Sequence, residues 1–416
     1  MKILIVCPYF PPENAIASVR IGKFAQHWAE DGHTVTVLCR NPVSEGVRVV
    51  EHQNLQVIPV RDPLESVWKK SVEMSGPTGS GRRDSLLRRV KAVFKRSFWP
   101  DVFGPWSAQA FRHARRLEMS PDVVIASVGP FSGLLLGSAL ARRFRAPLVL
   151  DYRDLLSFGT YYEHGRFRRR IDNVVERVIA SRAALTAAVS RPMVEELESL
   201  YKRPSIVVAN GYEPDDFVNL EYAPTSTTTR IVYCGQIYAG RRDPAPLFHA
   251  LRLLRSSGHP CDISVEFYGR NLAGVIASAA KYGVDDLVAY KGEVTHGQSL
   301  ELQAGADLLL LLLWDDPRER GVLSGKLFEY IGARRPIVML GLEDGAAADV
   351  VRSAGLGFVS NDPQTLADSL RALSEEKEAT GRIAAPQPPD PEAFTRRTQS
   401  NSFLRAIEGV VGSSGL

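Results

Sequence analysis

Apolar runs alternate with amphipathic segments along most of the chain. In the first half, short runs rich in Val, Ile and Leu predict buried strands. They are Lys2–Cys7, Thr34–Cys39, Gln56–Val60, Asp122–Ser127, Pro147–Leu150, Leu185–Val189 and Ser205–Val208. Helical periodicity lies between them, for example at Ala17–Asp31, Ser107–Leu117 and Phe167–Arg182. Because continuously apolar strands need cover on both faces, this alternation predicts a parallel sheet between layers of helices.

The same alternation begins again at Arg230. Strands are predicted at Ile231–Cys234, Ile263–Tyr268, Val288–Tyr290, Asp307–Leu313, Ile337–Leu340 and Gly357–Val359. Helices are predicted at Pro246–Ser256, Ala273–Tyr282, Gln298–Ala304, Lys326–Ala333, Ala346–Ser353 and Pro363–Leu373. The fold class is therefore α/β, with two doubly wound, Rossmann-like domains and a ligand cleft at their strand ends.

The break between the two patterns gives the domain boundaries. We predict an N-terminal domain at 1–212, a linker rich in Thr and Pro at 213–229, and a C-terminal domain at 230–390. A last amphipathic helix is expected from about Pro391 to Val411. A length of 416 residues also favours two domains over one.

Composition is that of an ordinary soluble protein. Apolar residues make up 44% of the chain and charged residues 24%, and the formal net charge of +4 gives no reason to expect a nucleic-acid partner. The four cysteines, Cys7, Cys39, Cys234 and Cys261, lack metal-ligand spacing, and we expect reduced thiols in a cytoplasmic protein. The prolines that follow the first strand argue against a signal peptide.

One uncharged stretch resembles a membrane span. It is residues 123–141, VVIASVGPFSGLLLGSALA. Its β-branched start and its internal Gly129-Pro130 instead predict a strand, a turn and a buried helix from Ser132.

Residues 69–99 form a basic insertion. A Gly/Ser-rich loop precedes Leu86, Leu87, Val90, Val93 and Phe94, which recur at helical spacing. The basic residues beside them are Arg82, Arg83, Arg88, Arg89, Lys91, Lys95 and Arg96. Two interpretations stay open: an amphipathic helix that lies on an anionic membrane or meets the acceptor, and a surface helix whose arginines are solvated.

Candidate chemistry in the first half lies directly after strands. The loop from Cys7 to Arg20 lacks Gly-x-Gly-x-x-Gly, so NAD or FAD is not expected. Asn14 and Ala15 let a ligand approach the start of the next helix, where anions are favoured. Asp151, Arg153 and Asp154 follow another strand and are candidate catalytic residues, a carboxylate being able to accept a proton from an acceptor hydroxyl. A structural Asp–Arg ion pair is the alternative.

Candidate chemistry in the second half is cationic. Gly235 permits a tight turn, and Arg241 and Arg242 at the end of the same loop could neutralise a diphosphate, although adjacent arginines are often only solvated. Gly325 and Lys326 begin a helix, again an anion site. Glu329 in that helix could accept two hydrogen bonds from a vicinal diol such as a ribose.

Together these segments resemble family 4 of the retaining, nucleotide-sugar-dependent glycosyltransferases, which have the GT-B fold. The similarity covers nearly the whole chain. It rests on PYFPPENA at 8–15, GHTVTVLC at 32–39, WPD at 99–101, DYRDL at 151–155, NGYEPDDF at 210–217 and GKLFEYIGARRPIV at 325–338. The branch it resembles most includes bacterial fucosamine transferases that build surface polysaccharides. The resemblance implies two domains facing a central cleft, with the C-terminal helix, within 391–416, crossing back to the first.

Some residues depart from the family pattern. The resemblance implies that Glu329 binds the ribose, but Gly321 stands where the family has a first Glu that contacts the donor sugar. Either Glu319, in a loop two residues upstream, or Lys326 with the amides near Gly325 is then expected to replace it. In the loop after Gly235, Gln236 stands where the family usually has Arg, and Arg241 where it has Lys. Arg242 is expected to restore the lost charge. The family's catalytic His has Arg153 or Asp151 in its neighbourhood here.

The implied reaction transfers a sugar from a UDP- or GDP-type donor to a glycan or lipid-linked acceptor, with retention. No metal or other cofactor is expected, because arginines, Lys326 and helix N-termini would stabilise the leaving group. We expect a cytoplasmic protein with peripheral contact to an anionic membrane. The alternatives are a nucleotide-sugar epimerase or hydrolase of the same fold, and a non-catalytic scaffold with a degenerate site.

Overall fold

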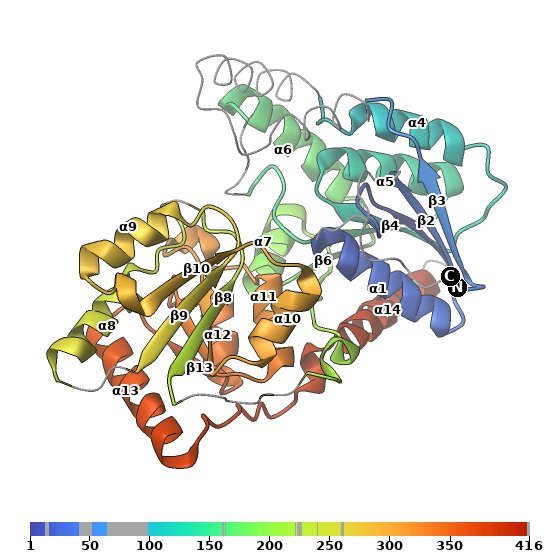
Figure 1. The fold of residues 1–416 in the computed structure, drawn as a ribbon. Coiled ribbons are helices and arrows are strands. Elements are labelled where there is room, and N and C mark those ends of the chain that lie inside the picture. Colours follow the sequence, from blue (N-terminus) through green and yellow to red (C-terminus); the bar gives the residue numbers. More distant parts are fainter. Residues whose placement is uncertain are drawn as a thin grey trace. The chain divides into compact units, whose positions relative to one another are not determined.

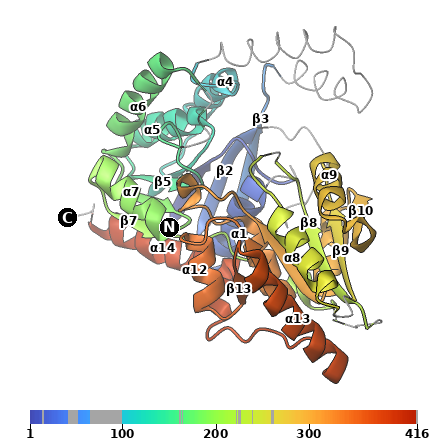
Figure 2. The same ribbon diagram turned by 90° about the vertical axis from the view of Figure 1, so that its left-hand side faces the viewer.

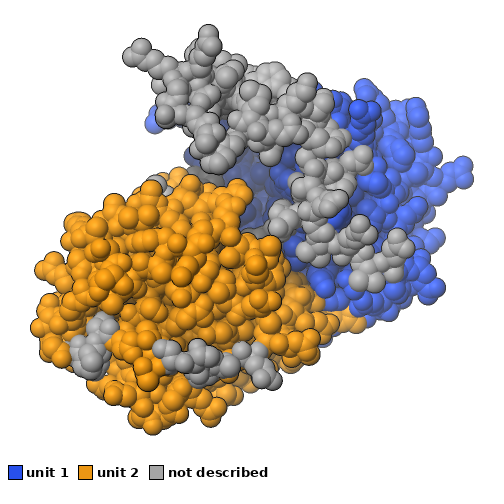
Figure 3. All heavy atoms as spheres, in the orientation of Figure 1, with its two compact units in different colours: residues 1–209, 399–416 blue, residues 210–398 orange. Residues whose placement is uncertain are grey.

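The computed structural model describes residues 1–12, 16–40, 52–64, 99–159, 162, 164–220, 222, 227–238, 240–258 and 262–413. The chain forms two compact units (Figure 3). Unit 1 contains residues 1–209 and 399–416, and unit 2 contains residues 210–398. Each has its own parallel sheet, so the predicted fold class is confirmed.

The sheet of unit 1 has the order β3-β2-β1-β4-β5-β6-β7 (Figure 1). Its strands are β1 (Lys2–Val6), β2 (Thr34–Arg40), β3 (Leu55–Val60), β4 (Val123–Val128), β5 (Leu148–Tyr152), β6 (Leu185–Ala188) and β7 (Ser205–Val207). The helices of this unit are α1 (Ile16–Glu30), α4 (Gly104–Ala114), α5 (Phe131–Phe144), α6 (Arg166–Ala180), α7 (Arg191–Tyr201) and most of α14 (Arg396–Ser413). All seven predicted strands of the first half are present.

Helices cover both faces of this sheet. On one face, Phe24 and Trp28 of α1 pack against Phe403 of α14, and Trp28 Nε1 donates to the Ser400 carbonyl at 3.1 Å. On the other face, α5 lies so close to β4 that a Cβ at Gly137 would overlap the side chain of Ala126. The central strands β4, β5 and β6 are therefore fully buried, as their continuous apolar runs require, whereas the edge strand β3 stays largely exposed.

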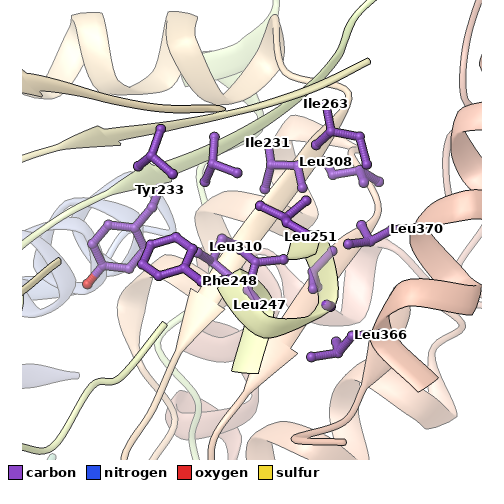
Figure 4. Close-up of a cluster of buried hydrophobic side chains, with 14 of the residues drawn as sticks. Ile231, Tyr233, Leu247, Phe248, Leu251, Ile263, Leu308, Leu310, Leu366 and Leu370 are labelled. Carbon is purple, nitrogen blue, oxygen red and sulfur yellow. The ribbon is translucent and has the colours of Figure 1, made fainter. Parts of the chain in front are cut away.

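The sheet of unit 2 has the order β10-β9-β8-β11-β12-β13. Its strands are β8 (Thr229–Cys234), β9 (Ile263–Tyr268), β10 (Val288–Gly292), β11 (Leu308–Leu312), β12 (Ile337–Leu340) and β13 (Gly357–Val359). The helices are α8 (Ala245–Ser256), α9 (Ala273–Tyr282), α10 (His296–Ala304), α11 (Gly325–Ala333), α12 (Ala346–Ser353) and α13 (Pro363–Thr380). Helices α8, α9 and α13 cover one face, where Leu251, Leu310 and Leu370 join one apolar core (Figure 4).

The predicted boundaries differ most from the structure in helices α13 and α14. Helix α13 continues to Thr380, beyond Leu373, although residues 374–380 show no apolar period. It continues because Lys377 turns inward to an ion pair, and Gly381, at φ +79°, ends the helix. Helix α14 starts at Arg396 and not at Pro391, because Thr395 forms a bridge to Tyr212 and its hydroxyl accepts from the Thr398 amide.

The segment expected as a linker, 213–229, belongs to unit 2 in its described part. Residues Pro214–Phe217 form a 3₁₀ turn. The ring of Phe217 packs on Tyr212, and a Cβ at Gly332 of α11 would overlap both rings. This aromatic contact holds the start of the segment on α11.

The uncharged stretch from Val123 folds as predicted, into β4 and then α5. No helix in the described part of the chain is long and apolar enough to cross a membrane. Cys7, Cys39 and Cys234 are buried free thiols, as predicted, and Cys261 lies outside the described residues.

A buried ion pair joins α13 to the sheet of unit 2. Lys377 Nζ donates to Asp307 Oδ2 and to the Thr228 carbonyl, both at 2.6 Å, and the Arg230 amide donates to the same carboxylate oxygen at 2.8 Å. Both charged side chains are buried. The carboxylate therefore depends on Lys377 for its counter-charge.

We expect Lys377→Met to lower the free energy of unfolding of unit 2 by about 3–5 kcal/mol, because it leaves Asp307 charged, buried and unpaired. Urea unfolding followed by circular dichroism measures this. Arg255→Ala is the control: it removes an exposed pair with Asp286 and should cost at most about 1 kcal/mol. Equal losses in the two variants would contradict the prediction.

Candidate functional site

The strand order of unit 2 reverses between β8 and β11. From β8 the chain proceeds to β9 and β10 on one side, and then returns to place β11 on the other. The loops after β8 and β11 therefore diverge at the carboxyl edge of the sheet. Ligands of doubly wound folds bind at such a switch point.

Because Gly235 has no side chain, the Lys326 side chain can lie at the switch point. Gly235 follows β8 with φ +151°, and a Cβ there would overlap Cε and Nζ of Lys326. The neighbouring loop approaches equally closely, because a Cβ at Gly269 would overlap the Gly235 carbonyl. Lys326 is in the first turn of α11, and its Nζ lies 5.7 Å from the centre of the Tyr233 ring.

The ammonium of Lys326 is held in an unfavourable environment. Burial and then the nearby charge of Arg242 lower its pKa from 10.5 to about 8, against the opposing effects of Glu329 and Cys234. Arg242 is held in the same loop because its Nη1 donates to the Gln236 carbonyl at 3.2 Å. An anion bound here would relieve the repulsion between the two cations.

The start of α11 adds further donors. Ser324 is its N-cap residue, yet the hydroxyl accepts no hydrogen bond from the helix, and its Oγ is buried without a partner in the described part of the chain. The amides at Gly325 and Lys326 thus begin a helix without a side-chain cap. Such a helix end favours a negative charge.

Glu329 lies one turn further along α11 and is half-buried. Gln303 of α10 donates from Nε2 to Glu329 Oε2 at 3.1 Å, and His296 Nδ1 lies 4.0 Å from Oε1. Gln303 is itself buried and also donates to Ser299 Oγ at 2.9 Å. The hydrogen bond from Gln303 to Oε2 therefore fixes the orientation of the carboxylate, and Oε1 lies beside the exposed His296.

Arg241 and Arg318 both lie against Trp314. Their guanidinium carbons are 4.9 and 4.5 Å from the indole centre, and Arg318 also pairs with Asp316 at 2.6 Å. Because Arg241 follows β8 and Trp314 follows β11, this stack joins the two loops of the switch point. The sequence analysis did not single out Trp314, although its place directly after a buried strand is a signal.

Glu319 does not lie in a free loop. It ends the 3₁₀ turn Pro317–Glu319 and is buried, and Asp316 caps this turn by accepting from the Arg318 amide at 2.9 Å. The carboxylate therefore exposes little surface to a ligand. Gly321 follows two residues later and is half-buried.

In unit 1, the three candidate catalytic residues differ in burial and partners, and both Asp154 and Asp151 lie near enough to Arg153 to raise its pKa against the effect of burial. Asp151 is fully buried in β5, and its Oδ2 accepts from Arg20 Nη1 at 2.5 Å. Arg153 donates to the Gly129 carbonyl at 3.1 Å, and burial lowers its pKa. Asp154 is exposed. Of the three, Asp151 thus has the geometry of the structural ion pair considered as the alternative.

Arg20 is a residue that the sequence analysis missed. It lies on α1, buried, and its Nη2 donates to the Val208 carbonyl at 2.8 Å. The signal was a single arginine on the apolar stripe of a helix. Two groups of predicted residues, Asn14 with Ala15 and the basic residues from Arg82 to Arg96, lie outside the described residues.

Comparison with known proteins agrees with this architecture. Residues 17–211 match the family described as glycosyl transferase 4-like domain. No curated protein sequence matches the chain. Among solved structures, HepE from Anabaena in complex with UDP-glucose is similar, with a TM-score of 0.63, 16% identity and coverage of 98% of this chain and 100% of that one.

Two further structures have other activities. The lipopolysaccharide outer core galactosyltransferase WaaB has a TM-score of 0.57 and 14% identity, with 98% of this chain and 99% of that chain covered. A UDP-N-acetylglucosamine 2-epimerase has a TM-score of 0.51 and 13% identity, with coverage of 97% and 94%. At these identities the similarity shows the fold.

The chain therefore has the GT-B fold, and its residues 17–211 match the glycosyl transferase 4-like family. The family resemblance is confirmed at this level. The closer similarity to fucosamine transferases stays a prediction.

We expect Asp151→Asn to lower the free energy of unfolding of unit 1 by about 3–5 kcal/mol, because the buried Arg20 would lose its counter-charge. Asp154→Asn is the matched control, since replacing this exposed carboxylate should change the free energy of unfolding by less than about 0.5 kcal/mol. Urea-unfolding midpoints of the two variants measure the difference. Two equally stable variants would show that the buried pair does not support the fold.

Proposed function

We propose that the protein is a retaining glycosyltransferase that takes its sugar from a nucleotide-diphosphate donor of the UDP or GDP type. The acceptor is a glycan or a lipid-linked glycan, and the product belongs to cell-surface polysaccharide. The observation that carries the proposal is the pair of cations, Lys326 and Arg242, beside an uncapped helix end at the switch point of unit 2. Similarity to HepE bound to UDP-glucose supports the donor class.

In this proposal, each group of the site meets one part of the donor. The diphosphate lies at Lys326, Arg242 and the first amides of α11, where charge-assisted hydrogen bonds are strongest. Glu329, oriented by Gln303, accepts from the ribose hydroxyls. When the bond from the anomeric carbon to the phosphate oxygen breaks, negative charge grows on the diphosphate, and the fixed cations stabilise it. The proposal includes no metal.

A second candidate follows from the fold shared with the epimerase. An epimerase or a hydrolase would change or release the sugar without an acceptor. A scaffold would bind nucleotide and turn nothing over. Incubation of the protein with the donor, with and without acceptor, separates these three outcomes.

The first test is a thermal-shift screen against UDP, GDP, ADP, CMP and dTDP. One of these should raise the melting temperature, since a ligand at 100 times its Kd adds about 2.7 kcal/mol to the native state. Glu329→Ala should weaken that binding roughly 10- to 100-fold, because hydrogen bonds to a charged group contribute about 1.5–3 kcal/mol. Glu301→Ala, an exposed glutamate of α10, is the control. No shift with any nucleotide would contradict the donor site and favour a degenerate site that no longer binds nucleotide.

We expect donor affinity to depend on the protonation of Lys326. The folded pKa of about 8 is below the ordinary 10.5, so the cation is fully present below pH 8 and is lost as the pH rises through that value. Affinity for the nucleotide sugar should be constant at lower pH and fall by up to about tenfold per unit above it. Calorimetric titration with the nucleotide at each pH measures the affinity.

Lys326→Arg is the control for this pH dependence, because a guanidinium stays protonated throughout this range. Its affinity profile should be flat through pH 8. The same break in both proteins would assign the titration to another group.

A further inference from the structure

Helix α6 of unit 1 has two chemically different faces. Its two acidic residues, Asp172 and Glu176, are both buried. Asp172 accepts from Trp99 Nε1 at 2.9 Å, and Glu176 accepts from the Ser157 amide at 2.9 Å and from the Tyr201 hydroxyl at 2.7 Å. Both carboxylates of the helix are therefore hydrogen-bonded inside the unit, and neither lies on its outer face.

The outer face carries an apolar stripe. Phe167 is 80% exposed and Val174 63%, and Ile171 and Val178 are exposed as well. These positions are spaced by four, three and four residues, so they form one line along the helix. Single exposed apolar residues are common, but four in one line indicate a contact surface.

Basic residues flank this stripe. Arg166, Arg170 and Arg177 of α6 are exposed, and so is Arg182 just beyond its end. By contrast, Arg169 turns inward and donates to the carbonyls of Ser157 and Gly159 at 3.1 and 2.7 Å. The outer face of the helix is therefore apolar and cationic, without an exposed acid.

Helix α6 lies at the outer side of its unit. It packs on α5 and α7, and Figure 2 shows it at the border of unit 1. Its 15 residues make a rod of roughly 22 Å, enough to lie flat on a surface.

We propose that this face binds the surface of an anionic lipid bilayer, with Phe167, Ile171 and Val174 among the headgroups and acyl chains and the arginines on the lipid phosphates. Apolar side chains beside arginines are the pattern of helices that lie in a membrane interface. A second copy of the chain fits less well, because self-association through this face would bring two rows of arginine together.

The test is sedimentation of the full chain with vesicles. Wild-type protein should bind phosphatidylglycerol vesicles and not phosphatidylcholine vesicles, and added salt should weaken the binding. The double variant F167S/R170E should bind at least roughly 30-fold more weakly, because each charge near the surface contributes about fivefold and a reversal counts twice. Both residues are exposed, so the melting temperature should not change.

The matched control is I276S/R252E, which makes the same kind of change on exposed residues of α9 and α8 in unit 2. It should bind vesicles like the wild type. Unchanged binding by F167S/R170E, or an equal loss in the control, would overturn the proposal. So would a dimer in light scattering that F167S/R170E dissociates, which would assign the face to a second copy. The assay needs no turnover, so its outcome is independent of the glycosyltransferase proposal.

Discussion

Parallel pairing of the strands is the constraint on which the rest of the structure depends. Every strand pair described in both sheets is parallel, so all carboxyl ends within a sheet meet at one edge. The return connections must then run as helices over the faces, which is why the central strands are buried on both sides. Polar chemistry is left to the loops at that edge. In unit 2 the strand order reverses between β8 and β11, and this reversal determines where along the edge the candidate site lies.

Two lysines of unit 2, one buried and one half-buried, show how an ammonium group can support either the fold or a binding site. Lys377 is held by Asp307 at 2.6 Å and ties α13 to the sheet. Lys326 takes part in none of the ion pairs among the described residues, and its neighbour Arg242 repels it. Two cations held side by side cost stability, and Glu329 offsets only part of this. That cost makes sense at a site whose anion arrives with the ligand, since binding then supplies a negative charge.

Local patterns predicted the strands, but not the polar contacts between distant residues. Continuous apolar runs define a buried strand within a few residues, and each predicted strand is present. The partners of the charged residues are different. Arg20 meets Asp151, 131 positions away, and Gln303 orients Glu329 from another helix. No periodicity encodes such pairs, because they follow from how the layers are packed. The same holds for Lys377, which extends α13 beyond its apolar pattern.

The missing family glutamate at Gly321 can be considered against this geometry. Glu319 is buried at the end of a 3₁₀ turn, so its carboxylate exposes little surface to a sugar. The start of α11 is less buried. Its first amides have no side-chain cap, Ser324 Oγ has no partner in the described part of the chain, and Lys326 is already in place. Of the two replacements that the sequence left open, we therefore expect the helix end with Lys326 to hold the donor sugar.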